Sequence, residues 1–206
     1  MARTTSPRRT TEDLRASALD EARALLIEGG PEQVKARVLA VRMGVSVGTV
    51  YNLFGHLDEL LFHVGGQVYD ELLEIISAAR EQARRENLST TDQLLALGRA
   101  YLNFVVDRQD LWSAVLAFNR RGKSQVPVWY LEKQRALFEV LESVIVEAKG
   151  HVDSPKHRTL TKALWAAVHG IITISVGPTG LSGTQDEVWA QIDLIVRAVA
   201  RDLGDA

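Results

Sequence analysis

A short stretch near the N-terminus carries side chains whose chemistry suits the edges of base pairs. Thr49 can donate or accept a hydrogen bond or touch a thymine methyl group, and Asn52 can pair with adenine. Gly48 adds no side chain, so another molecule can approach the backbone closely. Helical spacing lets these three residues face outward together with Val47 and Tyr51. Such a face fits the major groove of DNA, which admits an α-helix.

The residues around this stretch predict the elements that would hold it. We expect helices over residues 33–43 and 47–53, joined by a tight turn at Gly44, which adopts positive φ at little cost. Ala40 leaves room for the two helices to cross, and Ser46 is placed to cap the second one. The other contacts between them are assigned to apolar residues: Leu39, Met43, Val45, Val50 and Leu53. This spacing is that of a DNA-binding helix-turn-helix, although an ordinary helical hairpin in a core also fits it.

The residues that follow closely resemble the signature of the TetR family of transcriptional regulators. That signature, T-hydrophobic-Y-x-x-F-x-x-x-x-x-L-L after a G-V-S turn, is matched by residues 44–46 and 49–61. The resemblance is strong over residues 12–65 and extends to the rest only in layout. It implies an all-α fold with an N-terminal three-helix DNA-binding head that contains the helix-turn-helix. A long helix would join this head to a helical ligand-binding and dimerisation body.

The resemblance also implies which side chains contact the phosphate backbone. In the family, the tyrosine at the position of Tyr51 commonly contacts a phosphate, as does a residue at the start of the second helix, here Lys35 or Arg37. Arg42 is a further phosphate candidate, and each of these charges is otherwise explained by a solvated helix face. The predicted DNA-binding residues are Lys35, Arg37, Arg42, Ser46, Val47, Gly48, Thr49, Tyr51, Asn52 and His56.

The sequence departs from the family pattern at two positions. A histidine usually precedes the motif phenylalanine, where this chain has Leu53, and a lysine usually opens the fourth helix, where it has Leu57. That lysine normally reaches a phosphate, so its replacement removes one ionic contact and predicts weaker or less salt-dependent DNA binding. A protonated His56 is a speculative substitute for it.

Charge and composition limit the other possible functions. The chain has 206 residues, a net charge of −2 and no cysteine, which excludes disulfides, thiol catalysis and cysteine-based metal sites and fits a reducing cytoplasm. Basic residues slightly outnumber acidic ones in residues 1–56, whereas acidic residues dominate the remainder. No apolar run of about 18 residues predicts a membrane span. The basic N-terminus lacks the apolar core of a secretory signal.

Three segments are expected along the chain: a flexible basic arm (1–11), a helix-turn-helix DNA-binding domain (12–56) and a helical effector-binding and dimerisation domain (57–206). Arg3, Arg8 and Arg9 of the arm either touch DNA, as homeodomain arms do, or belong to a solvated tail. Thr11 is expected to cap the first helix, which Gly29 and Gly30 end.

Caps and apolar periodicity predict helices throughout the body. The fourth helix is expected from Leu57 toward Asn87, and Gly65 and Gly66 inside it mark a kink, close packing or a weak spot. Because this helix belongs to both head and body, movement at its far end would swing the recognition helix. Further helices are expected at residues 89–107, 110–120, 127–149, 154–176 and 185–203, with a loop at 177–183.

Aromatic residues gather in the middle helices of the expected body. An apolar cavity with aromatic walls and a few polar tips suits a small molecule, although aromatic stripes are also typical of an ordinary core. TetR-type bodies usually hold an inducer here, so the resemblance favours a pocket for an apolar or aromatic effector. His169 is either a satisfied core histidine or a hydrogen-bonding group in the pocket. The predicted effector pocket is Tyr101, Phe104, Trp112, Val115, Phe118, Trp129, Phe138, Trp165 and His169.

The two C-terminal helices are unusually apolar, which indicates that they have a partner. In the family they pair with their copies in a four-helix interface, and Gly170 would let another helix approach closely. A two-fold dimer presents two recognition helices about one DNA turn apart, so its operator is expected to be roughly palindromic. The predicted dimer interface is Leu164, Val168, Ile171, Ile172, Trp189, Ile192, Ile195, Val196 and Val199.

These observations favour a dimeric, ligand-responsive DNA-binding regulator with double-stranded DNA, a small-molecule effector and a second copy of the chain as partners. Repression is the family's usual mode. The alternatives are a helical protein-interaction module and a regulator with no small-molecule effector. An enzyme is not expected, because the sequence offers no nucleophile with a base, no phosphate loop and no metal cluster, and no cofactor is expected either. Neither the effector, the operator nor the regulated genes can be identified from the sequence.

Overall fold

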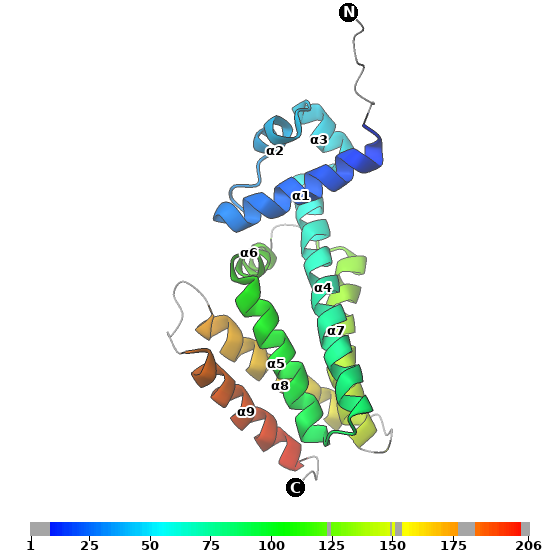
Figure 1. Ribbon diagram of the computed structural model, residues 1–206. Coiled ribbons are helices and arrows are strands. Elements are labelled where there is room, and N and C mark those ends of the chain that lie inside the picture. The colour runs from blue at the N-terminus through cyan, green and yellow to red at the C-terminus, as the bar shows by residue number, and fades with distance from the viewer. Residues whose placement is uncertain (1–8, 123–124, 149, 151–153, 177–183, 203–206) are drawn as a thin grey trace, which may run out of the picture. The chain divides into compact units, whose positions relative to one another are not determined.

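The computed structural model describes residues 9–122, 125–148, 150, 154–176 and 184–202. Within these ranges the regular structure is entirely helical, which confirms the all-α prediction. The helices are α1 (Thr11–Gly29), α2 (Ala36–Met43), α3 (Val47–Phe54), α4 (Leu57–Arg85), α5 (Thr90–Asp107), α6 (Gln109–Arg120), α7 (Val128–Ala148), α8 (Pro155–Ser175) and α9 (Gln185–Asp202), as labelled in Figure 1. The loop expected at residues 177–183 lies outside the described residues.

The chain forms two compact units. The head unit consists of Met1–Gly65 and Ser113–Gln125, and the body unit consists of Gly66–Trp112 and Val126–Ala206. Both α4 and α6 therefore begin in one unit and end in the other. The predicted division by function, at residues 11 and 56, stays a prediction.

In the head unit, α1 packs against both α2 and α3. Ala18 and Ala22 of α1 are fully buried, and their small side chains let the helices approach closely. Ala40 and Val50 are buried as well, at the crossing predicted for them. Helices as short as α2 and α3 are marginal on their own, so their packing on α1 is what stabilises them.

Two helix starts in the head differ from the sequence prediction. Thr10, not Thr11, caps α1: its Oγ1 accepts the N–H of Asp13, and the Asp13 carboxylate accepts the N–H of Thr10. The bond from the Thr10 N–H, with a second one donated by Thr10 Oγ1, stabilises the carboxylate and lowers the pKa of Asp13. α2 begins at Ala36 rather than residue 33, because the N–H of Gln33 bonds to the carbonyl of Gly30 in a turn.

In the body unit, α9 packs on α5 and α8, and α7 packs on α5 and α8. Its core contains the fully buried side chains of Leu72, Leu102, Phe104, Tyr130, Ile145, Ile172 and Ile192. Gly66 of α4 lies against Trp129 of α7: a Cβ added to this glycine would be 2.9 Å from the Trp129 ring. Close packing is thus the role of Gly66. None of the helices in the described ranges is long and apolar enough to cross a bilayer.

Candidate nucleic-acid interface and effector pocket

The turn between α2 and α3 has the geometry that its residues predict. Gly44 is left-handed, with φ 67° and ψ 37°. Its N–H bonds to the carbonyl of Val41 at 3.2 Å, and the N–H of Val45 bonds to the carbonyl of Ala40 at 2.9 Å, which is a Schellman motif. Ser46 caps α3, since its Oγ accepts the N–H of Thr49 at 3.1 Å. These bonds fix the start of α3 relative to α2.

One side of α3 is buried and the other is open to solvent. Val50, Leu53 and Phe54 face the core of the head unit, whereas Tyr51 is 46% exposed. Thr49 is half-buried, and the other predicted DNA-binding residues are all exposed: Lys35, Arg37, Arg42, Ser46, Val47, Gly48, Tyr51, Asn52 and His56. The predicted set is therefore accessible on α2, α3 and the turns beside them.

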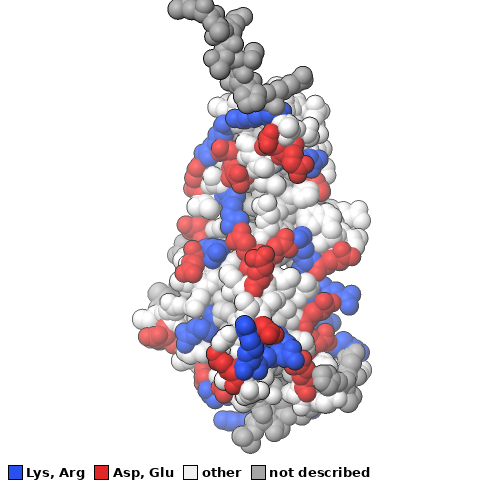
Figure 2. All heavy atoms as spheres, turned by 45° about the vertical axis from the view of Figure 1, so that its right-hand side comes forward, with Lys and Arg blue, Asp and Glu red and all other residues white. Residues whose placement is uncertain are grey.

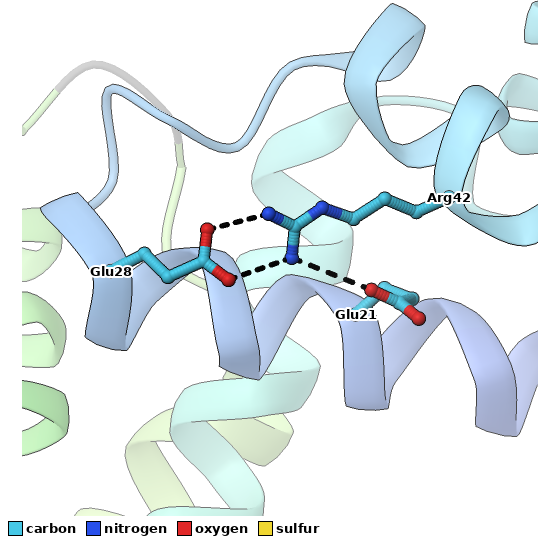
Figure 3. A network of polar contacts seen from close by, with 3 residues as sticks. All are labelled: Glu21, Glu28 and Arg42. Carbon is cyan, nitrogen blue, oxygen red and sulfur yellow. Dashed lines mark hydrogen bonds and ion pairs between the residues drawn. The ribbon is translucent and has the colours of Figure 1, made fainter.

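Arg42 has ion-pair partners on α1 that were not predicted from the sequence. Its Nη1 and Nη2 donate to the two carboxylate oxygens of Glu28 at 2.9 and 2.5 Å, and Nη1 lies 3.6 Å from Glu21 (Figure 3). The ion pair lowers the pKa of Glu28 and raises that of Arg42. Glu21 and Glu28 lie seven residues apart, on one face of α1. That spacing is the feature of the sequence that could have predicted an acidic partner for a neighbouring arginine. Arg42 thus ties α2 to α1, and its contact with phosphate stays a prediction.

His56 has a structural role besides the DNA contact predicted for it, which stays a prediction. Its Nδ1 accepts the N–H of Glu59 at 3.0 Å, so the imidazole caps the start of α4. Because Nδ1 is the acceptor in this bond, the ring nitrogen that can donate to another partner is Nε2. Leu53, where the family has a histidine, is buried, and Leu57, where the family has a lysine, is half-buried.

Arg9 is the one described member of the three arginines assigned to the arm. Its Nη1 donates to the carbonyl of Met43 at 2.9 Å, at the C-terminal end of α2. A cation is favourable there, because the last carbonyls of a helix are unpaired and negatively polarised. Arg3 and Arg8 lie outside the described residues.

The face drawn in Figure 2 has no large area of positive charge among its described residues. Lys and Arg side chains are interspersed with Asp and Glu among the described residues of this face. Together with the net charge of −2, this indicates that affinity for a polyanion must come from individual contacts rather than from the field of the whole molecule.

In the body, Tyr101 is at the centre of an aromatic cluster. Its hydroxyl lies 2.6 Å from Nδ1 of His169, and its ring stacks on Trp165 at a centroid distance of 5.3 Å. Trp112 meets the rings of Tyr101 and Phe104 edge-on, each at 5.8 Å. Burial raises the pKa of Tyr101 well above its ordinary value, so the phenol keeps its proton. Phe138 completes the cluster, 4.9 Å from Trp165.

Three residues predicted for the pocket do not join this cluster. Val115 and Phe118 belong to the head unit, where Phe118 meets the ring of Phe62 at 5.0 Å. The apolar periodicity of α6 does not predict that the helix passes from the body unit to the head unit after Trp112. Trp129 instead covers Gly66 and contacts Tyr130.

Two hollows in the body unit share Trp165 in their walls. The inner one has a volume of about 40 Å³ and is lined by Tyr101, Trp165 and aliphatic residues including Leu94, Leu137 and Val168. The outer one is a groove of about 630 Å³ along α7 and α8, lined by Phe138, Trp165 and charged residues including Arg135, Arg158 and Lys162. Pockets for drug-sized ligands have volumes of about 300–1,000 Å³, so the groove is within that range and the inner cavity is far below it.

Five of the nine residues predicted for the dimer interface are buried within the chain itself. Leu164, Val168, Ile172, Ile192 and Val196 are at most 7% exposed, because α8 and α9 pack on each other and on α5 and α7 within one chain. Their apolar character is explained by the core, so they cannot form a free surface. The other four predicted residues are half-buried: Ile171, Trp189, Ile195 and Val199.

The exposed apolar residues of α8 and α9 are different ones. Ile174 is 58% exposed and Leu194 is 68% exposed. Gly170, expected to admit another helix, has no atom of the described chain within 4 Å of an added Cβ. The exposure of Ile174 and Leu194 could not be predicted from composition. Leu194 and its neighbour Ile195, for example, are both apolar, but only Leu194 is exposed.

The described residues contain no group of three or more His, Asp or Glu side chains that could hold a metal ion. What the structure does offer is a helix-turn-helix whose second helix has an accessible outer face. A helix-turn-helix head followed by a helical body, as the described residues show, is typical of DNA-binding regulators.

Comparison with known families identifies the class more closely. Residues 18–64 match the family described as bacterial regulatory proteins, tetR family, and residues 94–199 match the tetracyclin repressor-like C-terminal domain. Together these matches include the helix-turn-helix and most of the body. The chain belongs to the TetR family of transcriptional regulators.

Solved structures share the fold over nearly the whole chain. A protein of unknown function from Rhodococcus sp. RHA1 is 21% identical, with 95% of this chain and 98% of that one covered and a TM-score of 0.75. A putative TetR-family regulator from Mesorhizobium loti MAFF303099 is 17% identical, with the same coverage and a TM-score of 0.72. FadR from Bacillus subtilis, solved with stearoyl-CoA, is 15% identical, with coverages of 89% and 96% and a TM-score of 0.67. No curated protein matches the sequence.

Proposed function

We propose that this TetR-family regulator is a dimeric repressor that a small, largely apolar effector releases from a palindromic DNA operator. The observation that carries the proposal is the outer face of α3, where Val47, Tyr51 and Asn52 are exposed on a helix fixed by its cap and turn. Helix-turn-helix proteins place such a helix in the major groove, with its N-terminal residues at the base edges.

Phosphate contacts would come from the residues that flank this face. Lys35 and Arg37 are exposed at the start of α2, and Tyr51 is exposed on α3. With Nδ1 engaged in the cap of α4, the N–H at Nε2 of His56 is the group that can donate to a phosphate oxygen. Few cationic contacts predict a shallow dependence of affinity on salt.

The effector is proposed to bind in the body unit, at the groove along α7 and α8. Phe138 and Trp165 supply its apolar wall, and rotation of Trp165 would join the groove to the inner cavity beside Tyr101. Tyr101, whose hydroxyl lies 2.6 Å from Nδ1 of His169, offers a polar group in the wall of the inner cavity. FadR, which has this fold, was solved with stearoyl-CoA, so the fold can accommodate a ligand with a long apolar part.

The dimer is proposed to form through the outer faces of α8 and α9. Ile174 and Leu194 are exposed there, and Gly170 leaves space for a helix of a second copy. Small exposed residues lie on the same two helices: Ala163, Ala190 and Ala198. Such residues let helices of two copies pack closely, as a four-helix interface requires.

Release follows from differential affinity. An effector shifts the equilibrium only if it binds better to the conformer whose two heads do not match the operator spacing. By linkage, effector and DNA must then weaken each other's binding by the same factor.

Selection of duplexes from a random pool, at two salt concentrations, tests the proposal. The protein is first unfolded and refolded to remove any ligand acquired during expression. Enrichment of an inverted repeat is expected, and retention of random sequences only, at both salt concentrations, would refute the regulator with a palindromic operator.

A helical protein-interaction module is the alternative function. The double variant Thr49→Ala, Tyr51→Ala distinguishes the two, because both side chains lie outside the head core. For a repressor, operator binding collapses while the circular dichroism spectrum and the dimer persist.

A regulator without an effector is the second alternative, and the small volume of the inner cavity favours it. Thermal shifts of the protein with a library of apolar carboxylates and aromatics would distinguish it, since no compound would then stabilise the body.

A further inference from the structure

The first turn of α3 presents no charged side chain. The helix sequence is VGTVYNLF, so the side chains that could enter a groove are neutral. Guanine is most often read by a bidentate Arg or Lys, and α3 has neither. Its readout of bases must therefore use other chemistry.

Thr49 has its hydroxyl turned toward the cap of the helix. Its Oγ1 lies 3.0 Å from Oγ of Ser46, which also accepts the Thr49 N–H at 3.1 Å. The two γ substituents of threonine diverge from Cβ, so the hydroxyl lies on the side of Ser46 and the methyl group points elsewhere. The hydroxyl of Thr49 is thus engaged with Ser46, and the methyl group is the part of the side chain left for contact with a base.

Val47 and Gly48 complete this surface. Val47, the first residue of α3, is 38% exposed although it is a branched apolar side chain. A Cβ added to Gly48 would meet only Oγ of Ser46, at 3.6 Å, so nothing else covers the backbone there. The first turn thus has two methyl-bearing side chains on either side of a residue that adds no bulk.

We infer that the first turn of α3 recognises thymine through its C5-methyl group, by apolar contact from Val47 and the methyl of Thr49. This inference rests on the proposed function, in which α3 enters the major groove. Thymine is the base that presents a methyl group in that groove, whereas cytosine presents an amino donor. An apolar side chain gains from covering the methyl and would leave the amino group of cytosine without a partner, which is costly.

Uracil substitution in the selected operator tests this inference with the full-length protein. Each thymidine of one half-site is replaced in turn by deoxyuridine, which removes only the C5-methyl group, and Kd is measured by fluorescence anisotropy. Loss of one buried methyl is expected to weaken binding about fourfold. At least one position in the substituted half-site should show this loss.

A variant then assigns the contact to its side chain. Val47→Ala should bind the thymine and uracil duplexes equally at the position that Val47 covers, and thermal unfolding confirms that the variant is folded. Val41→Ala is the matched control, because Val41 of α2 is 77% exposed and lies outside α3. It should keep the uracil sensitivity of the wild type.

The outcomes separate this inference from the proposed function. If an inverted repeat is selected but every uracil duplex binds within twofold of the thymine duplex, α3 does not read methyl groups and the inference is wrong, although the regulator stands. If Val47→Ala retains the full uracil sensitivity at every position, the role given to Val47 is wrong. If no operator is selected, the proposed function fails and the inference fails with it.

Discussion

Ser46, Arg42 and His56 lie on the exposed surface of the head and also make bonds that hold its helices. Ser46 caps α3, Arg42 pairs with Glu28 of α1, and His56 caps α4. Side chains that are already fixed lose less conformational entropy when they meet a partner. The head is therefore ordered before it meets DNA, at the positions where the contacts are proposed.

The hydroxyl of Tyr51 gives the first prediction at this scale. Tyr51→Phe keeps the ring and removes the proposed hydrogen bond to a phosphate, and such bonds to charged groups contribute about 1.5–3 kcal/mol. Operator affinity should fall at least about tenfold, equally for all operator variants, since phosphate contacts carry no sequence information. Anisotropy titrations measure this loss, and an unchanged Kd would exclude a contact from the hydroxyl.

Tyr101 gives a prediction about pH. Burial raises its pKa in the folded chain above the ordinary value of 10.0, so the folded state keeps a proton that the unfolded state loses. The wild type should therefore lose stability as pH rises above about 10, and Tyr101→Phe should lose less. Urea unfolding of both proteins from neutral to alkaline pH measures the difference in slope. Parallel curves would mean that Tyr101 ionises equally in both states.

At the scale of elements, α3 depends on the turn before it. Eight residues are too few for a stable isolated helix. The Schellman motif at Gly44 and the cap at Ser46 pair its end groups, and Val50 and Phe54 bury its inner side. The outer face of α3 therefore keeps its position because the turn, the cap and the buried side chains all stabilise the same helix.

Substitution of Gly44 tests this dependence. An added Cβ meets no atom within 4 Å, but φ is +67°, so Gly44→Ala introduces backbone strain and no clash. The left-handed conformation costs an alanine about 1–2 kcal/mol, and the free energy of unfolding should fall by that amount. Gly44→Asn is the matched control and should lose less, because asparagine tolerates this conformation. Urea unfolding that ranks the two variants equally would contradict the argument.

This turn also shows what the sequence can and cannot predict. Gly44 and Ser46 act on residues within five positions of themselves, so their roles are contained in the local sequence. Arg42 and Glu28 are fourteen positions apart on different helices, and only the packing of α1 on α2 brings them together. The start of α2 differs from the prediction for a local reason instead, since a turn that joins Gly30 to Gln33 delays it.

At the scale of the whole molecule, the same limit applies to α8 and α9. Their apolar residues predict that something covers them, but not whether it is the same chain or a second one. Ile192 is fully buried within one chain, whereas Leu194, two positions later, is 68% exposed. Residues two apart face different sides of a helix, so the structure separates the core from the free surface where composition does not.

This separation yields a prediction about assembly. Leu194→Glu places a charge on the proposed dimer surface and leaves the core of the body unit intact. Because a buried unpaired carboxylate is costly, the dimer should weaken by at least about 2 kcal/mol, which is about thirtyfold in its dissociation constant. Sedimentation at several concentrations measures this shift, and circular dichroism checks the fold.

Val128→Glu is the matched control, because Val128 at the start of α7 is 71% exposed and outside α8 and α9. It should keep the assembly of the wild type. Operator affinity provides the second readout. A palindrome needs two heads in one complex, so the Leu194 variant should lose the cooperative part of its binding while Val128→Glu retains it. A Leu194 variant with the sedimentation behaviour and operator affinity of the wild type would place the dimer contact on another face.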